Sequence, residues 1–221
     1  MARKPRSEMI IETRAKLVAA ARRAFGTAGY AAASMDDFTA TAGLTRGALY
    51  HHFGDKKGLL EAVIAQIDAE MSVRLSAVSA KAASPWQGFV DECAAYIEMA
   101  LEPEIQRIVL RDGPAVLGDP WQWPTQSACI RSMTASLQQL IAQGAITAID
   151  PEAAARLISG ATLHAAQWIA HADDPVDASK KAIQALNTLL DGLRAHSAKP
   201  TRIKTLLPPA GRAGKPLSSR A

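Results

Sequence analysis

The chain has 221 residues and a formal net charge of +4, a length that suits one large domain or a small domain fused to a medium one. Hydrophobic residues make up 48% and aromatic residues only 5%, which favours packed helices over a β-sandwich. The sequence shows no apolar run as long as a membrane span, no signal-peptide core after the charged N-terminus, and only two cysteines, so we expect a soluble, cytoplasmic protein without a disulfide framework.

The first 80 residues predict four helices separated by short breaks. Apolar residues recur on one helical stripe between Ile10 and Phe25. Glycines and polar capping residues mark the ends of the elements that follow, because Gly favours helix C-termini and Ser, Thr and Asp favour N-caps. The expected helices lie at residues 10–25, 34–42, 45–53 and 55–80, with Ser34, Thr45 and Asp55 as N-caps.

The rest of the chain is also expected to be helical, apart from one loop and the C-terminus. Residues 113–124 are too rich in Pro and Gly for regular structure and predict an ordered loop. Residues 199–221, which carry six basic side chains and four prolines, predict a disordered tail. No strand or internal repeat is evident, so the predicted fold class is all-α. The expected helices lie at residues 85–101, 105–111, 125–144, 151–171 and 176–196.

Charge is distributed unevenly along the chain. Residues 1–60 hold ten Lys/Arg against five Asp/Glu, whereas residues 61–198 hold nine against sixteen. Residues 199–221 hold six basic and no acidic side chains. This distribution predicts an anionic partner for the two ends and not for the middle, although a solvated tail and an ordinary surface are an open alternative.

Residues 34–53 form the motif with the clearest chemistry. Two short helices joined by a glycine turn, and flanked by longer helices, are typical of a helix-turn-helix that sets its second helix into the DNA major groove. Leu49 and Phe53 lie four residues apart and are expected to face inward, against Phe38. The other face of helix 45–53 is then available to DNA.

Side chains on that outer face are the candidate DNA contacts. The guanidinium fork of Arg46 matches O6 and N7 of guanine. Gly47 and Ala48 are small enough for close approach, and Ala48 suits contact with a thymine methyl group. The hydroxyl and imidazole groups suit phosphates, and Lys56 adds a cation near a helix N-terminus. The expected DNA-binding residues are Ser34, Thr45, Arg46, Gly47, Ala48, Tyr50, His51 and Lys56.

Residues 19–63 resemble the TetR family of one-component regulators. The resemblance rests on the order and spacing of Phe25, Gly29, Tyr30, Ala42, Gly43, the GALYHHF block at 47–53, Lys56 and the Leu59-Leu60 pair. Residues 35–37 depart from the more usual pattern but keep Phe38 as the inward residue. The resemblance implies a three-helix DNA-binding domain followed by a helical ligand-binding and dimerisation domain. The corresponding division is a basic arm at 1–10, the DNA-binding domain at 11–71, the second domain at 72–198 and the basic tail at 199–221.

By the same resemblance, the last two long helices, 151–171 and 176–196, form a four-helix dimer interface. A surface of small residues agrees with close packing there, and packing within one subunit is the alternative. The small residues are Ala154, Gly160, Ala161, Ala165 and Ala166.

The second domain also holds all four tryptophans, and these suggest an effector pocket. Apolar walls with a few polar groups are typical of such a pocket, although the same residues at helical spacing also fit a plain core. His164, Trp168 and His171 continue one stripe with no matching Cys or carboxylate cluster, so no metal or cofactor is expected and they line the core or a pocket. For Cys93, a redox-sensing thiol is an alternative. The candidate ligand-binding residues are Trp86, Phe89, Cys93, Tyr96, Trp121, Trp123, His164 and Trp168.

Together these features predict a sequence-specific DNA-binding regulator, most simply a homodimeric repressor released from a palindromic operator by a small-molecule effector. The expected partners are double-stranded DNA, a second copy of the chain and the effector, with no membrane. A ligand-independent regulator or activator and a non-specific architectural DNA-binding protein are the alternatives. An enzyme is not expected, because the sequence shows no nucleophile with its base, metal cluster or phosphate-binding glycine loop. Helix 55–80 touches both domains in this interpretation and is the expected lever between them.

Overall fold

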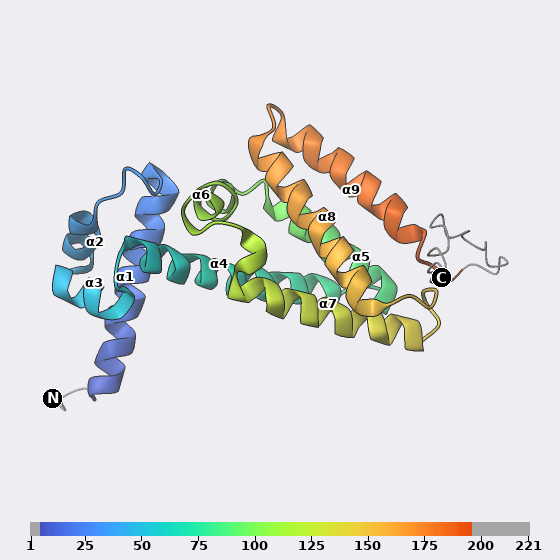
Figure 1. Cartoon of the computed structure of the whole chain (residues 1–221), viewed down its shortest axis with the longest axis horizontal. Coiled ribbons are helices and arrows are strands. Elements are labelled where there is room, and N and C mark those ends of the chain that lie inside the picture. Colours follow the sequence, from blue (N-terminus) through green and yellow to red (C-terminus); the bar gives the residue numbers. More distant parts are fainter. Residues whose placement is uncertain (1–4, 196–221) are drawn as a thin grey trace, which may run out of the picture.

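The computed structural model describes residues 5–195, and every regular element in that range is a helix. Figure 1 shows a small group of helices at one end, joined by one long helix to a larger bundle. The small group consists of α1 (Arg6–Ala28), α2 (Met35–Ala42) and α3 (Arg46–Phe53), and the joining helix is α4 (Lys56–Ser79). The bundle consists of α5 (Pro85–Met99), the π-helical segment η1 (Ile105–Asp112), α6 (Gly113–Leu117), the 3₁₀ turn η2 (Pro120–Gln122), α7 (Pro124–Ala142), α8 (Pro151–His171) and α9 (Pro175–Asp191). The predicted all-α class is confirmed.

The small N-terminal domain is held together by an aromatic and aliphatic core. Phe25, Phe38 and Leu49 are almost completely buried. The rings of Phe25 and Phe38 meet edge to face with their centroids 5.3 Å apart, a favourable aromatic geometry. Because these residues come from α1, α2 and α3, the core fixes the orientation of α3 relative to α1 and α2.

Helix α4 connects this domain to the bundle. It packs against α1 and α3 near its start and against α5 and α6 further along. Its buried residues continue from one core into the other, with Leu59 and Leu60 at one end and Ile67 and Met71 at the other. One helix therefore packs against both the N-terminal helices and the bundle.

The predicted loop at residues 113–124 is wrong, because residues 113–117 form α6 and residues 120–122 form η2. Pro114 stands at the second position of α6, which follows η1 without a break. Gly113 is buried, and a Cβ there would come within 2.7 Å of the Trp123 ring and 3.1 Å of Ile64. Close packing on the core therefore holds a segment whose composition alone suggests a loop, and Gly118, at φ 83°, ends the helix.

The ends of the chain differ from the predicted boundaries. Helix α1 begins at Arg6, so residues 6–10 of the predicted basic arm are helical. Helix α9 ends at Asp191 rather than near residue 196. Residues 1–4 and the predicted tail at 199–221 lie outside the described residues. Within residues 5–195, no helix combines the length and hydropathy needed to cross a membrane.

Candidate functional site

Capping residues set the geometry of the α2–α3 unit. The hydroxyl of Ser34 accepts a hydrogen bond from the Asp36 N–H at 3.2 Å, and Thr45 Oγ1 accepts one from the Ala48 N–H at 3.2 Å. Each cap satisfies an otherwise unpaired amide at a helix start. Between the two helices Gly43 takes the left-handed conformation, with φ 65°, which an L side chain rarely adopts. The geometry of the turn therefore follows from residues within the α2–α3 unit itself.

Within residues 5–195, no other helix covers the outer face of α3. Thr45, Arg46, Gly47, Tyr50 and His51 are exposed, and Tyr50 retains 52% of its accessible surface. Figure 1 places α2 and α3 at the end of the molecule away from the bundle. The remaining predicted contacts, Ser34, Ala48 and Lys56, are partly buried at its edge. The structure thus brings the predicted DNA-binding residues together around one projecting helix.

The side chain of Arg46 is paired with a carboxylate on the neighbouring helix. Its Nη2 donates to Asp36 Oδ2 at 2.6 Å, and both side chains are exposed. The two residues are ten positions apart, across the glycine turn, so no helical periodicity in the sequence reveals the pair. An exposed ion pair contributes roughly 0–1 kcal/mol, so Arg46 can exchange this partner for another at little cost.

Two further cations border the α2–α3 unit. Lys56 Nζ lies 4.4 Å from the centroid of the Tyr30 ring and donates to the Ala31 carbonyl at 3.4 Å. Partial burial lowers the pKa of Lys56. Arg14 stacks 4.5 Å from the Phe53 centroid and donates to a carbonyl of α3 at 3.3 Å. Arg14 was not among the predicted contacts, because nothing in the spacing of α1 places it beside α3.

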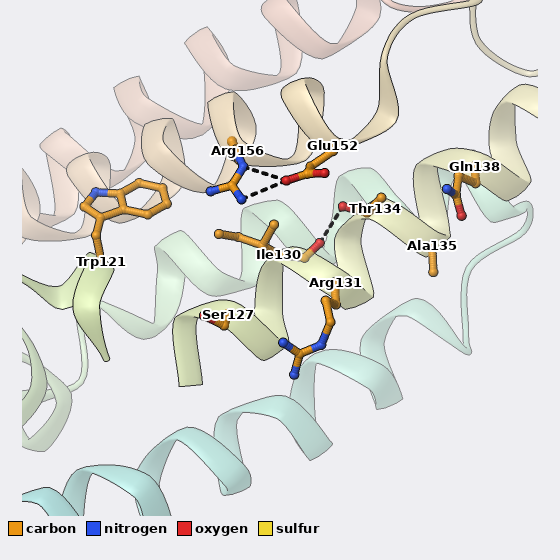
Figure 2. Close-up of a pocket in the computed structure, with 9 residues that line it drawn as sticks. All are labelled: Trp121, Ser127, Ile130, Arg131, Thr134, Ala135, Gln138, Glu152 and Arg156. Atoms are coloured by element: carbon orange, nitrogen blue, oxygen red, sulfur yellow. Dashed lines mark hydrogen bonds and ion pairs between the residues drawn. The ribbon is translucent and has the colours of Figure 1, made fainter. Parts of the chain in front are cut away.

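Two cavities in the described part of the bundle differ in character. An open groove of about 390 Å³ lies along α7 and α8, and Figure 2 shows Trp121 at one end and Gln138 at the other. In this groove Arg156 donates to Glu152 at 2.8 and 3.0 Å, while Arg131 points away from that pair. A smaller interior cavity of about 40 Å³ lies where α4, α5, η1, α7 and α8 meet. The residues that line the interior cavity are Asp68, Tyr96, Val109, Leu110, Pro120, Trp123, Thr125, Gln126, Leu163 and Gln167.

The predicted ligand-binding residues fall into separate places. Tyr96 and Trp123 line the interior cavity, whereas Trp121 lines the open groove. Trp86 and Phe89 are buried core residues whose rings stack with centroids 6.1 Å apart, and they line neither cavity. No spacing in the sequence indicates that Asp68, Gln126 and Gln167 share a cavity with Tyr96 and Trp123, because these residues meet only in the folded chain.

The interpretation of His164 and Trp168 as core or pocket residues is wrong for the single chain. His164 is exposed, Trp168 is 48% exposed, and neither lines either cavity. The stripe to which they belong runs along the outside of α8, where Leu157 is 75% exposed. A helical stripe identifies residues that share a face, but it does not say whether that face is turned inward.

Cys93 is poorly suited to redox sensing. Cys93 is buried, and burial raises the pKa of its thiol to about 12. The pKa of Cys129 is also raised, first by desolvation and then by the nearby Glu92 carboxylate. A raised pKa disfavours the thiolate, which is the reactive form. Among residues 5–195 no three His, Cys, Asp or Glu side chains are grouped to hold a metal ion.

Two family models match most of the described chain. The model described as "Bacterial regulatory proteins, tetR family" matches residues 17–63, which contain α2 and α3. The model described as "Tetracyclin repressor-like, C-terminal domain" matches residues 86–193, which contain the bundle from α5 to α9.

Curated proteins and solved structures agree with these matches. The chain is 45% identical over 53 residues to the HTH-type transcriptional regulator TtgR of Pseudomonas putida, covering 24% of this chain and 25% of TtgR. It is 35% identical over 66 residues to the HTH-type transcriptional repressor AcnR of Corynebacterium efficiens, covering 30% of this chain and 35% of AcnR. A crystal structure of a TetR-family transcriptional regulator from Pectobacterium atrosepticum is 53% identical, with a TM-score of 0.80, and the match covers 87% of this chain and 99% of that one.

Proposed function

The chain belongs to the TetR family of DNA-binding transcriptional regulators, and from this premise we propose that it is a homodimeric repressor that a small-molecule effector releases from a palindromic operator. The repressor part is supported by the name of AcnR, although that match covers only 35% of AcnR. The observation that carries the proposal is the projecting outer face of α3, which exposes polar and small side chains. The opposite face of α3 is held in the core, where Leu49 and Phe38 are buried.

Recognition of the operator is assigned to the outer face of α3. Arg46 is suited to a guanine edge, and Gly47 leaves room for the backbone to approach the bases. Thr45, Tyr50 and His51 are suited to phosphates, which position the helix without reading sequence. Lys56, at the start of α4, adds a phosphate contact from a helix N-terminus.

Dimerisation is assigned to the exposed stripe on α8. Leu157 is 75% exposed and Trp168 is 48% exposed, and Ala161 and His164 lie between them at helical spacing. On the neighbouring helix α9, Leu189 is 69% exposed. Two copies related by a two-fold axis would bury these apolar side chains against each other and present two α3 helices to successive major grooves.

Release is assigned to movement of η1 together with α4. Arg107 of η1 donates to the carbonyls of Thr27 and Ala28 at 3.2 and 3.1 Å, and Asp112 accepts from the Tyr30 N–H at 2.8 Å. On its other side η1 contributes Val109 and Leu110 to the interior cavity. An effector that favours another position of η1 would therefore change how the N-terminal domain is held, and would weaken operator binding by its difference in affinity for the two states.

The test begins with selection of bound sequences from random DNA, using the full chain. We expect a palindromic winner bound at least about a thousandfold more tightly than random DNA. Arg46→Ala should relax preference at one base position in each half-site, whereas Lys56→Ala should weaken all sequences alike. Similar affinity for the winner and for random DNA would instead indicate an architectural DNA-binding protein. A ligand screen on the winner then tests release.

A further inference from the structure

Several polar groups line the interior cavity, although packing of the core requires only apolar side chains there. It has a volume of about 40 Å³, enough for one or two water molecules. Apolar walls come from η1 and α8, and polar groups enter from α4, α5 and the segment around Trp123. An apolar core of the same shape would be filled by aliphatic side chains alone, so these polar groups need their own explanation.

The first of these groups is the carboxylate of Asp68, on α4. It faces the cavity, and burial raises its pKa, while the hydroxyl of Thr125 hydrogen-bonds to it and lowers its pKa in part. None of the residues that line the cavity is Lys, Arg or His. Asp68 and Glu92 both lie close enough to Cys129 to raise its pKa, so the surroundings are negative. This interior disfavours an anionic occupant and favours one that brings a positive charge.

The second group is the indole of Trp123. Its Nε1 is buried and has no hydrogen-bond acceptor within the described part of the chain. A buried donor without an acceptor is unfavourable, and an occupant with an oxygen acceptor would satisfy it. The rings of Trp123 and Tyr96 also form part of the wall, and aromatic faces beside a carboxylate stabilise an organic cation.

We propose that this cavity binds a small organic amine that also carries a hydroxyl or carbonyl oxygen, with the ammonium on Asp68 and the oxygen on Trp123 Nε1. Such a molecule is the effector class of the proposed repressor, and in that respect the inference rests on the proposed function. The cavity is smaller than any such molecule, so its walls move apart on binding. Val109 and Leu110 are among those walls, and they belong to the segment whose Asp112 accepts the Tyr30 N–H.

The binding test uses probes that share one skeleton and differ in charge. Tyramine carries an ammonium, tyrosol a neutral hydroxyl and 4-hydroxyphenylacetate a carboxylate at the same place, and tryptamine with tryptophol gives a second matched pair. Calorimetry on the full chain without DNA, at pH 7.5, should show the amine of at least one pair binding at least tenfold more tightly than its alcohol, and no binding of the carboxylate. Equal affinity within both pairs, or no binding of either amine, overturns the proposal.

Substitutions then assign the contacts. Asp68→Asn should weaken the amine at least tenfold and leave the matched alcohol unchanged, whereas Asp173→Asn, at an exposed carboxylate outside the cavity, should change neither. Trp123→Phe should reduce tyramine affinity to that of phenethylamine, which lacks the phenolic oxygen. Thermal melts check folding, and the Tm of Asp68→Asn should equal or exceed that of the parent because the substitution removes a partly buried carboxylate. An undiminished amine affinity in Asp68→Asn overturns the assignment.

Failure of this inference is distinguishable from failure of the proposed function. If an amine binds through Asp68 but leaves operator affinity unchanged, the site is correct and release by this effector is not. If a neutral or anionic ligand releases the operator while neither amine binds, the proposed function holds and the amine site is wrong.

Discussion

Asp36 places a negative charge on the outer face of the α2–α3 unit, beside the arginine assigned to base reading. Because the ion pair with Arg46 is exposed, the carboxylate competes for the guanidinium and repels phosphate without contributing much stability. Asp36→Asn should therefore tighten operator binding about fivefold, or ~1 kcal/mol, with the same preferred sequence. Fluorescence anisotropy at two salt concentrations measures the effect, which should shrink as salt rises. Asp37→Asn, at the adjacent exposed carboxylate, is the control, and an equal gain there would mean that only total charge matters.

Arg22 joins three elements through two carboxylates. It donates to Glu104 through two nitrogens at 2.8 Å and to Glu70 at 2.7 Å, so α1 is tied to α4 and to the residue before η1. These hydrogen bonds hold the pKa of Glu70 below its usual value. A lowered carboxylate pKa adds stability that is complete above the unfolded pKa, about 4.3, and is lost as the pH falls through the folded value.

Arg22→Gln should therefore lower the Tm at pH 7 by roughly 3 °C, for a loss of about 1 kcal/mol, and the difference from the parent should shrink below about pH 4. Thermal melts across this pH range provide the measurement. Arg74→Gln serves as the comparison, because its pair with Glu102 is more exposed and its loss should cost less. A deficit that stays constant down to pH 3.5 would show that the ion pairs do not carry the effect.

Among the helical elements, η1 contacts the N-terminal domain on one side and lines the interior cavity on the other. Asp112 accepts the Tyr30 N–H at 2.8 Å, and the Tyr30 ring lies under Lys56. Asp112→Ala should remove protection of the Tyr30 amide in hydrogen exchange and weaken operator binding about fivefold on all sequences. Asp119→Ala, which removes only the cap of η2, should do neither. Unchanged protection at Tyr30 would mean that this contact does not restrain the N-terminal domain.

The helices that the sequence predicts well are those with local signals at their ends. Ser34, Thr45 and Asp55 all cap helices as expected, because a cap needs only an oxygen two or three residues before an amide. Helix α6 was missed because its support is distant in sequence, namely the contact of Gly113 with the Trp123 ring and Ile64. Local composition describes the preference of a segment, and packing overrides it.

The same distinction separates the two candidate sites in the whole molecule. The proposed DNA-binding face of α3 lies within twenty consecutive residues, 34–53, so the sequence suffices to propose it. The interior cavity gathers Asp68 from α4, Tyr96 from α5 and Trp123 from between η2 and α7, and no spacing in the sequence connects them. The exposed stripe on α8 is intermediate between these two sites. Helical periodicity in the sequence groups its residues on one face, but only their exposure in the structure shows that this face points outward.

In the proposed dimer, the stripe on α8 is the interface that allows two copies to present two α3 helices to DNA at once. Leu157 is 75% exposed in the single chain, so Leu157→Glu should leave the fold of the subunit unchanged. In the proposed dimer it buries an unpaired carboxylate in each subunit, which costs several kcal/mol. Sedimentation at micromolar concentration should then show monomers, and operator affinity should fall at least a hundredfold because one half-site remains bound. Val73→Glu, at a residue 70% exposed on α4, should stay dimeric and bind normally. A dimeric Leu157→Glu protein would place the interface elsewhere on the bundle.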